Sequence, residues 1–377
     1  MTRIDPVELT RELVRIDTVN PPGNEARCLD LLGELLTGAG FRVEDVPLAP
    51  GRPNLIARLP GTEEVPALAF TGHVDVVPLG TEPWRHDPFG AEIEDGRLYG
   101  RGASDMKSGT ATIVAAAIEA AARSGGRAPV ELVLTSCEEV GLEGAATVAR
   151  SGRLGRAGAL VVAEPTGLRA GIGYRGLNWC DLHFTGRTAH ASQPEQGDNA
   201  LLKAARAAIT LAEWDFDGAE HPALGRPGLN VARIEGGQNY NSVPDRAKLG
   251  IDMRLLPDQA VEEVERRIAE ITGCARLERL MATPAVWTDP SDPWLQSVRA
   301  LLGELLGAPV ALGTVPYSTD ASFLAPGYGG VPVLVLGPGE AEQAHQTDEW
   351  CEVAKIEKAF AIYLRLIEDW SSRASAA

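Results

Sequence analysis

The first indication of the fold is the segment Leu68-Ala-Phe-Thr-Gly-His73-Val-Asp75-Val-Val-Pro78. Residues 67–70 are apolar and predict a buried strand that ends at Thr71-Gly72. The next polar side chains are His73 and Asp75. In an open α/β sheet, binding and catalytic groups lie at the carboxyl ends of strands. A histidine there, followed by a carboxylate, indicates a metal ligand with the partner that orients its ring, although a single His-x-Asp also occurs as a structural feature.

Two later apolar runs also end in acidic residues. The run 129–136 is followed by Cys137-Glu138-Glu139, and the run 159–163 is followed by Glu164. Both runs predict strands, and segments of helical character alternate with the strands. This alternation predicts a doubly wound α/β sheet. We therefore expect three strands to deliver His73, the glutamate pair and Glu164 at their carboxyl ends.

A glycine-rich loop, Gly100-Arg-Gly-Ala-Ser-Asp105-Met-Lys-Ser-Gly109, precedes an alanine-rich helix predicted at 110–123. A loop of this kind can bind phosphate at a helix N-terminus. Here the spacing is not that of a P-loop, and the preceding segment does not resemble a buried parallel strand. We prefer the alternative, in which Asp105 points into the site at the sheet edge.

Residues 175–284 differ in character from the rest of the chain. They predict strands at 177–184, 229–235 and 248–255 and helices at 198–214 and 258–272. This order predicts an inserted α+β domain of ferredoxin-like type with one exposed sheet face. The α/β pattern resumes afterwards, so we expect the main domain to consist of residues 1–174 and 285–377.

Composition excludes several classes of partner. The chain has 377 residues, 44% hydrophobic and 23% charged, which is enough for two domains. A formal charge of -17 argues against nucleic acid and anionic membranes as partners. The five cysteines include no CxxC motif and favour free thiols in a reducing compartment. The polar N-terminus predicts no secretory signal, and no apolar run is long enough to span a bilayer, so we expect a cytoplasmic protein.

The polar side chains expected at the sheet edge are five acids and two histidines. They are His73, Asp75, Asp105, Glu138, Glu139, Glu164 and His345. Carboxylates that converge without cations repel one another. Two divalent cations would neutralise them, and mixed histidine and carboxylate ligands suit zinc, with cobalt or manganese as substitutes. Each acid alone could be a solvated loop residue, but together they predict a dinuclear metal site.

At this point the sequence resembles the acetylornithine deacetylase / succinyl-diaminopimelate desuccinylase / carboxypeptidase G family of dinuclear zinc amidohydrolases. The resemblance spans nearly the whole chain, in the same order and spacing. The matching stretches are Gly72–Pro78, Trp84 with Asp87-Pro-Phe89, Gly100–Gly109, Glu138-Glu139, Glu164-Pro-Thr166 and Ala344-His345-Gln-Thr-Asp-Glu349. The resemblance implies a zinc-peptidase-like catalytic domain, with residues 175–284 as a lid and dimerisation domain.

The resemblance also implies that each chain binds two Zn²⁺ ions. Asp105 would bridge the ions, His73 and Glu164 would complete one site, and Glu139 and His345 would complete the other.

Two neighbouring acids have other implied roles. Asp75 would orient His73, and Glu138 would be the general base that takes a proton from the bridging water and passes it to the leaving amine. Adjacent residues at a strand end point in different directions, so one glutamate can bind metal while the other faces the substrate. The resemblance further implies a cis peptide between Asp105 and Met106.

Residues of the lid domain and one loop have implied substrate contacts. His190 resembles the histidine that stabilises the oxyanion, in dimeric members across a homodimer. Arg254 and Asn241 resemble groups that bind the substrate carboxylate, for which a guanidinium is well suited. Gly337 and Gly339 could offer backbone N–H groups to the same carboxylate, or could simply form a turn.

The expected function is hydrolysis of the amide bond of an N-acyl amino acid or a small peptide. Deacetylation of a substrate such as acetylornithine is our first expectation and desuccinylation the second. Ser318-Thr-Asp320-Ala-Ser322-Phe resembles a desuccinylase segment, but Ser322 stands where that segment has arginine. Carboxypeptidase or dipeptidase activity comes third. A non-catalytic relative used for binding or assembly is the alternative from another class.

Overall fold

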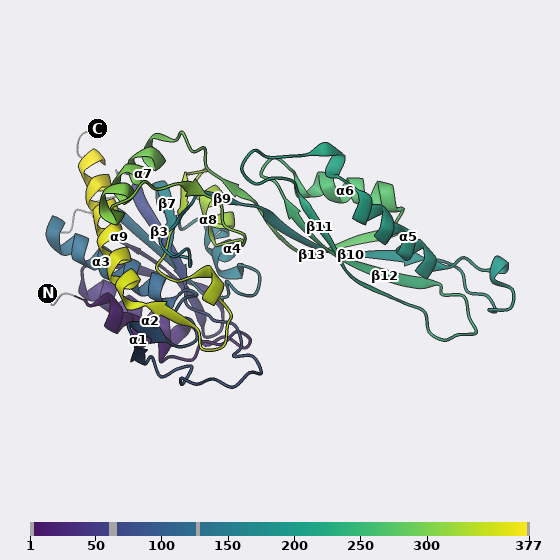
Figure 1. Ribbon diagram of the computed structural model, residues 1–377, viewed down its shortest axis with the longest axis horizontal. Coiled ribbons are helices and arrows are strands. Elements are labelled where there is room, and N and C mark those ends of the chain that lie inside the picture. Colours follow the sequence, from purple (N-terminus) through teal and green to yellow (C-terminus); the bar gives the residue numbers. More distant parts are fainter. Residues whose placement is uncertain (1–3, 60–65, 126–128, 375–377) are drawn as a thin grey trace. The chain divides into compact units, whose positions relative to one another are not determined.

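The computed structural model describes residues 4–59, 66–125 and 129–374. The chain forms two compact units (Figure 1). The first consists of Met1–Gly173, Trp287–Val315 and Thr319–Ala377, and the second of Tyr174–Val286 and Pro316–Ser318. The second unit is thus formed mainly by a segment inserted into the chain of the first.

The first unit contains an eight-stranded sheet with the order β1-β2-β6-β3-β7-β16-β8-β15. Its strands are β1 Arg42–Ala49, β2 Arg52–Arg58, β3 Ala67–His73, β6 Val130–Thr135, β7 Ala157–Val162, β8 Ala170–Gly171, β15 Leu312–Gly313 and β16 Val333–Val335. Strands β6, β3, β7 and β16 are parallel neighbours, whereas β1 and β2 are antiparallel. Residues of β3 and β6 are buried almost throughout, which explains their continuous apolar character.

Helices cover both faces of this sheet (Figure 1). On one face lie α1 Pro6–Val14, α2 Ala26–Gly38, α3 Lys107–Ser124, α7 Pro293–Leu306 and α9 Val353–Ala374, which share one hydrophobic core. On the other face lie α4 Glu143–Arg150 and α8 Ala321–Gly327. Helix α3 is buried along most of its length because its many alanines let α1 and α9 pack closely against it.

Short elements complete the first unit and its connections. A small sheet is formed by β4 Ile93–Glu94, β5 Arg97–Tyr99 and β17 Trp350–Glu352, and Ala341–Gln343 is a 3₁₀ turn. The pieces β9 Gly173–Tyr174 and β14 Val286–Trp287 lie where the chain passes between units. Among residues 4–59, 66–125 and 129–374, no helix combines the length and apolar character needed to cross a bilayer.

The second unit is an antiparallel sheet with the order β11-β12-β10-β13 and two helices. Its elements are β10 Gly176–Thr185, α5 Ala200–Glu213, β11 Gly228–Gly236, β12 Arg246–Leu255, α6 Val261–Thr272 and β13 Arg276–Thr283, with 3₁₀ turns at Pro194–Gln196 and Phe216–Gly218. Helices and sheet share a core of their own. The predicted fold class, a doubly wound mixed sheet with an inserted α+β domain, is confirmed.

Some local features differ from the sequence-based expectation. Helix α4 and strand β13 were not predicted, because α4 is short and the charged and apolar residues of β13 do not alternate regularly. Asn199 caps α5 by accepting a hydrogen bond from the Leu202 N–H. Asn24, two residues before α2, donates to the Asp17 carbonyl.

A buried carboxylate in the second unit joins three strands. Asp181 of β10 lies 2.9 Å from Arg233 of β11 and 3.1 Å from Lys248 of β12. Because β12 lies between β10 and β11, the Arg233 side chain has to cross it. It crosses at Gly250, where an added Cβ would lie 2.6 Å from Arg233 Cγ. Although burial acts in the opposite direction, Arg233 and Lys248 lower the pKa of Asp181.

Asp181→Asn should therefore lower the free energy of unfolding of the protein at neutral pH by about 1–2 kcal/mol. A carboxyl whose pKa is lower in the folded state contributes stability above its unfolded pKa, and that contribution is lost as pH falls through the folded value. The difference between wild type and variant, measured by urea unfolding, should thus shrink below about pH 4. A difference that stays constant down to pH 2 would contradict the ion-pair assignment, and Asp258→Asn at an exposed position is the control.

Candidate metal centre

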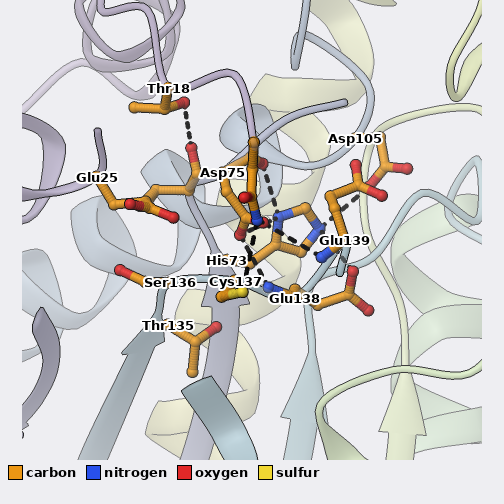
Figure 2. Close-up of polar contacts among 12 residues, drawn as sticks. Thr18, Glu25, His73, Asp75, Asp105, Thr135, Ser136, Cys137, Glu138 and Glu139 are labelled. Carbon is orange, nitrogen blue, oxygen red and sulfur yellow. Dashed lines mark hydrogen bonds and ion pairs between the residues drawn. The ribbon is translucent and has the colours of Figure 1, made fainter. Parts of the chain in front are cut away.

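Three neighbouring parallel strands position most of the candidate ligands. His73 is the last residue of β3, Glu138 and Glu139 follow β6, and Glu164 follows β7. Since β3 lies between β6 and β7 and parallel to both, these side chains emerge at the same edge of the sheet. Asp105 comes from the loop before α3 and approaches the same point (Figure 2).

The structure brings the predicted ligands within a few ångströms of one another. His73 Nε2 lies 3.3 Å from Asp105 Oδ1 and 3.7 Å from Glu164 Oε1. His345 Nε2 lies 3.4 Å from Asp105 Oδ2 and 3.0 Å from Glu139 Oε2. Asp105 therefore contacts one histidine with each of its oxygens, the arrangement expected of a carboxylate shared between two cations.

The two adjacent glutamates reach different histidines. Glu139 contacts His345, whereas Glu138 Oε2 lies 3.9 Å from His73 Nε2. Among the described residues, two sets of side chains lie close enough together to hold a cation, and both contain His73. They are His73 with Asp105 and Glu139, and His73 with Glu138 and Glu164. His345 adjoins the first set through its contacts with Asp105 and Glu139.

Burial and mutual repulsion shift the pKa values of the carboxyl groups in the centre. Burial raises the pKa of Glu138 and Glu164 well above the ordinary value, and neighbouring carboxylates raise it further. Burial likewise raises the pKa of Glu139, with Asp105 as the next cause. For Asp105, burial acts in the same direction, but the His345 and His73 imidazoles outweigh it and lower the pKa.

The surrounding negative charge raises the pKa values of the two histidines. Burial lowers the pKa of His73, but Asp105, Glu138 and Glu164 outweigh burial and leave that pKa well above its ordinary value. Hydrogen bonds with Asp105 and Glu139 raise the pKa of His345 to about 10. The centre thus attracts positive charge, which protons supply when no other cation is bound.

The residues fit a pair of divalent cations. Asp105 Oδ1 and Glu139 Oε1 are buried, and no donor in the described part of the chain forms a hydrogen bond with them. A buried acceptor without a donor is costly unless a cation contacts it. Imidazole nitrogens mixed with carboxylate oxygens suit zinc and related divalent ions.

Asp75 contacts more than the His73 ring. His73 Nδ1 lies 3.0 Å from the Asp75 backbone carbonyl and 3.6 Å from Asp75 Oδ1. The Asp75 carboxylate accepts hydrogen bonds from the backbone N–H groups of Glu138 and Glu139, at 3.0 and 3.2 Å (Figure 2). Cys137 has φ of 60°, and this turn directs both N–H groups to one acceptor. Asp75 therefore holds the glutamate pair, and its backbone carbonyl makes the shorter contact with the ring.

Asn20 is a residue of this network that sequence reasoning missed. Its side-chain amide donates to Asp75 Oδ2 at 2.9 Å, and it is buried. The segment around it is fixed because Thr18 Oγ1 donates to the Val74 carbonyl and the Asn20 N–H donates to the Val76 carbonyl. The only signal in the sequence is a polar residue before two prolines, which does not by itself indicate a partner.

The predicted glycine turn packs against the strand ends. A Cβ at Gly337 would lie 2.2 Å from the Ala163 carbonyl oxygen, and one at Gly339 would lie 2.2 Å from that of Ser104. The Gly337 N–H already donates to Thr166 Oγ1 at 3.1 Å. These contacts explain both glycines by close backbone approach, and the Gly337 N–H is used inside the protein. The Asp105–Met106 peptide is cis.

The remaining predicted residues belong to the second unit. His190 and Asn241 lie on two exposed loops, joined by a hydrogen bond from the Ala191 N–H to the Asn241 carbonyl. The Ser192 N–H donates to His190 Nδ1 at 3.2 Å, which leaves the ring proton of the neutral imidazole on Nε2. Arg254 on β12 is paired with Asp252 at 3.1 Å.

Comparisons with known proteins agree with this geometry. The sequence profile of Peptidase family M20/M25/M40 matches residues 69–369. The chain is 34% identical to succinyl-diaminopimelate desuccinylase from Cereibacter sphaeroides, over 97% of this chain and 99% of that protein. It is 31% identical to acetylornithine deacetylase from Edwardsiella ictaluri, over 92% and 91%.

Solved structures share the fold. The M20 family metallo-carboxypeptidase Sso-CP2 from Sulfolobus solfataricus has a TM-score of 0.80 at 18% identity, covering 98% of this chain and 100% of that chain. A dinuclear metal-binding peptidase of the same family from Bacillus subtilis has a TM-score of 0.74 at 16% identity, covering 99% and 98%.

Metal binding to the metal-free protein should release protons. The pKa of His345 is about 10 and that of His73 is also raised, so both rings carry an extra proton at pH 7 that a cation displaces. Burial also raises the pKa of the ligands Glu139 and Glu164, so we expect roughly two or more protons per chain, measured by calorimetry in buffers of different ionisation enthalpy. The number should fall as pH rises towards the pKa of His345.

His345→Gln should reduce the number of protons released on metal binding, whereas His183→Gln in the second unit should leave that number unchanged. Release that is unchanged in His345→Gln would remove this histidine from the cation site.

Proposed function

This chain belongs to peptidase family M20/M25/M40, a family of metal-dependent hydrolases, and from that premise we propose that it cleaves the amide bond of N-acyl amino acids. One observation carries the proposal: five candidate ligands converge at one sheet edge, and Glu138 lies beside them. A base next to a dinuclear centre can catalyse the addition of water to an amide.

Glu138 is the proposed general base. Two divalent cations held by Asp105, His73, Glu164, Glu139 and His345 would lower the pKa of water and polarise the amide carbonyl. Glu138 takes a proton from the water that adds to the carbonyl carbon. It then passes the proton to the nitrogen as the C–N bond breaks, which yields a carboxylate and an amine. Burial raises the pKa of Glu138 above that of an exposed glutamate, which makes its carboxylate a stronger base.

Residues of the second unit have proposed roles toward the substrate. His190, with its proton on Nε2, donates a hydrogen bond to the oxyanion of the tetrahedral intermediate, within one chain or across a dimer. Arg254 and Asn241 bind the carboxylate of the amino acid. The contacts of Gly337 and Gly339 favour a packing role over substrate contact for these two glycines.

A homodimer through the second unit is also proposed. Strands β11 and β13 are the edges of a four-stranded sheet, and an edge strand can pair with the same strand of a second copy. Exposed apolar side chains, Leu202 and Ile209 on α5 and Ile234 on β11, support an interface here.

Acetyl is the proposed acyl group, and succinyl is the second candidate. The desuccinylase relative favours succinyl. Against it, Ser322 stands where the desuccinylase segment has arginine, and its side chain is buried in α8. A buried serine offers no positive charge to a second carboxylate on the acyl group.

Glu138→Gln should lower kcat by about three orders of magnitude or more while two cations stay bound. Glu139→Gln, at the neighbouring residue, is the comparison variant, and it should lower both the metal content and kcat. Metal content by elemental analysis, together with kcat, separates the two outcomes. Ordinary turnover in Glu138→Gln would refute the base assignment.

The substrate class is tested with three compounds: an N-acetyl diamino acid, an N-succinyl diamino acid and a free dipeptide. We expect the highest kcat/KM for the acetylated compound, with acetate released. Preferential release of succinate, or of free amino acids from the dipeptide alone, would replace the proposed activity by desuccinylase or dipeptidase activity. Hydrolysis of none of them by the zinc-loaded protein would favour a non-catalytic relative.

A further inference from the structure

Arg101 and Glu349 form a buried ion pair next to the metal centre, with 2.7 Å between Arg101 Nη1 and Glu349 Oε2. We infer that this pair positions Asp105 and His345, and that it sets the affinity of the cation held by Asp105, Glu139 and His345. The inference rests on the ligand roles proposed above. Neither Arg101 nor Glu349 is among the proposed ligands, so both are positioning residues.

Glu349 fixes the loop that carries Asp105. Its Oε1 accepts hydrogen bonds from the backbone N–H groups of Ser104 and Asp105, at 2.8 and 2.9 Å. Its Oε2 accepts from the Gly102 N–H at 3.0 Å as well as from Arg101. The side chain is fully buried. Four donors on one carboxylate leave the loop little freedom to move Asp105.

Arg101 joins the segments that carry the two histidines. Its Nη1 donates to the Gln346 carbonyl at 3.1 Å, next to His345. Its Nη2 donates to the Pro78 carbonyl at 3.2 Å, at the end of the segment that begins with His73. The side chain is buried, and its guanidinium lies 5.1 Å from the centre of the Trp84 ring. One side chain therefore contacts segments that are far apart in the sequence.

The cation bound by His345 should depend on this pair more than the other cation does. His73 ends a central strand and is 1% exposed, so the sheet itself holds it. His345 is 52% exposed and lies in a loop with φ of 65°. Its position depends on the residues that follow it, and Gln346 and Glu349 are held by Arg101 and the Asp105 loop.

The replacement Glu349→Gln tests the inference without measuring activity. The amide nitrogen cannot accept hydrogen bonds, so part of the four-donor arrangement is lost while the side-chain volume is kept. The metal-free protein is titrated with Co²⁺, followed by calorimetry and by the visible absorption of the bound ion. We expect one affinity to fall by about 10–100-fold, with a changed cobalt spectrum, and the other to change much less.

Glu131→Gln is the matched control. Glu131 is also a buried carboxylate, and it accepts from Arg58 at 2.5 Å, from Tyr328 at 2.6 Å and from the Gly155 N–H at 3.1 Å. It lies near the start of β6, at the opposite end of the strand from Glu138. The control should lower the melting temperature and leave both cobalt affinities and the cobalt spectrum unchanged.

Two results would overturn the inference: wild-type cobalt affinities in Glu349→Gln, or equal weakening in Glu131→Gln. Arg101→Lys is the second variant, for use if circular dichroism shows that Glu349→Gln does not fold. It keeps the positive charge but loses the planar fork, so the affinity of the cation held by Asp105, Glu139 and His345 should again fall. Two unchanged affinities would again refute the proposal. Because the readout is metal binding, a negative result leaves the proposed deacylase activity standing, and absent activity leaves the inference standing.

Discussion

Negative charge buried at the edge of a parallel sheet is the constraint on which the rest of this structure depends. Two layers of carboxylates are compensated in different ways. Asp75 and Glu349 are saturated by backbone N–H groups, by Asn20 and by Arg101. In the inner layer, Asp105 and Glu139 each have a buried oxygen that accepts no hydrogen bond from any described residue. The outer layer is complete within the protein alone, whereas the inner layer requires added positive charge.

The strand ends were the predictable part of the site. His73, Glu138, Glu139 and Glu164 follow apolar runs, and parallel strands deliver their end residues to one edge whatever the details of the loops. The fold class could be predicted for the same reason, since continuous apolar runs alternate with helices. Asp105 and His345 were expected at the same edge, but only the family resemblance assigned them to particular cations, because both lie on loops whose path the local pattern does not indicate.

The hydrogen-bonding partners could not be predicted. Asp75 follows His73 by two residues, which suggests a contact with its ring, yet the Asp75 carboxylate bonds to the backbone after β6. This hydrogen bonding depends on the positive φ of Cys137, and a cysteine in the sequence does not indicate a positive φ. Asn20, Arg101 and Glu349 were missed as partners because the Asn20–Asp75 contact spans 55 positions and the Arg101–Glu349 contact spans 248. Strand β13 was missed because a half-exposed strand with charged residues has no clear period.

The contact between Arg233 and Asp181 across Gly250 has a consequence for the solubility of the second unit. Side chains alternate between the two faces of a strand, so a slip of β11 by one residue would turn Arg233 to the opposite face and break its contact with Asp181. The ion pair therefore locks the pairing of an outer strand to a single alignment. A strand held in this way cannot slip into an alternative pairing with β12, so one buried aspartate and one glycine disfavour the mispaired forms from which aggregates can grow.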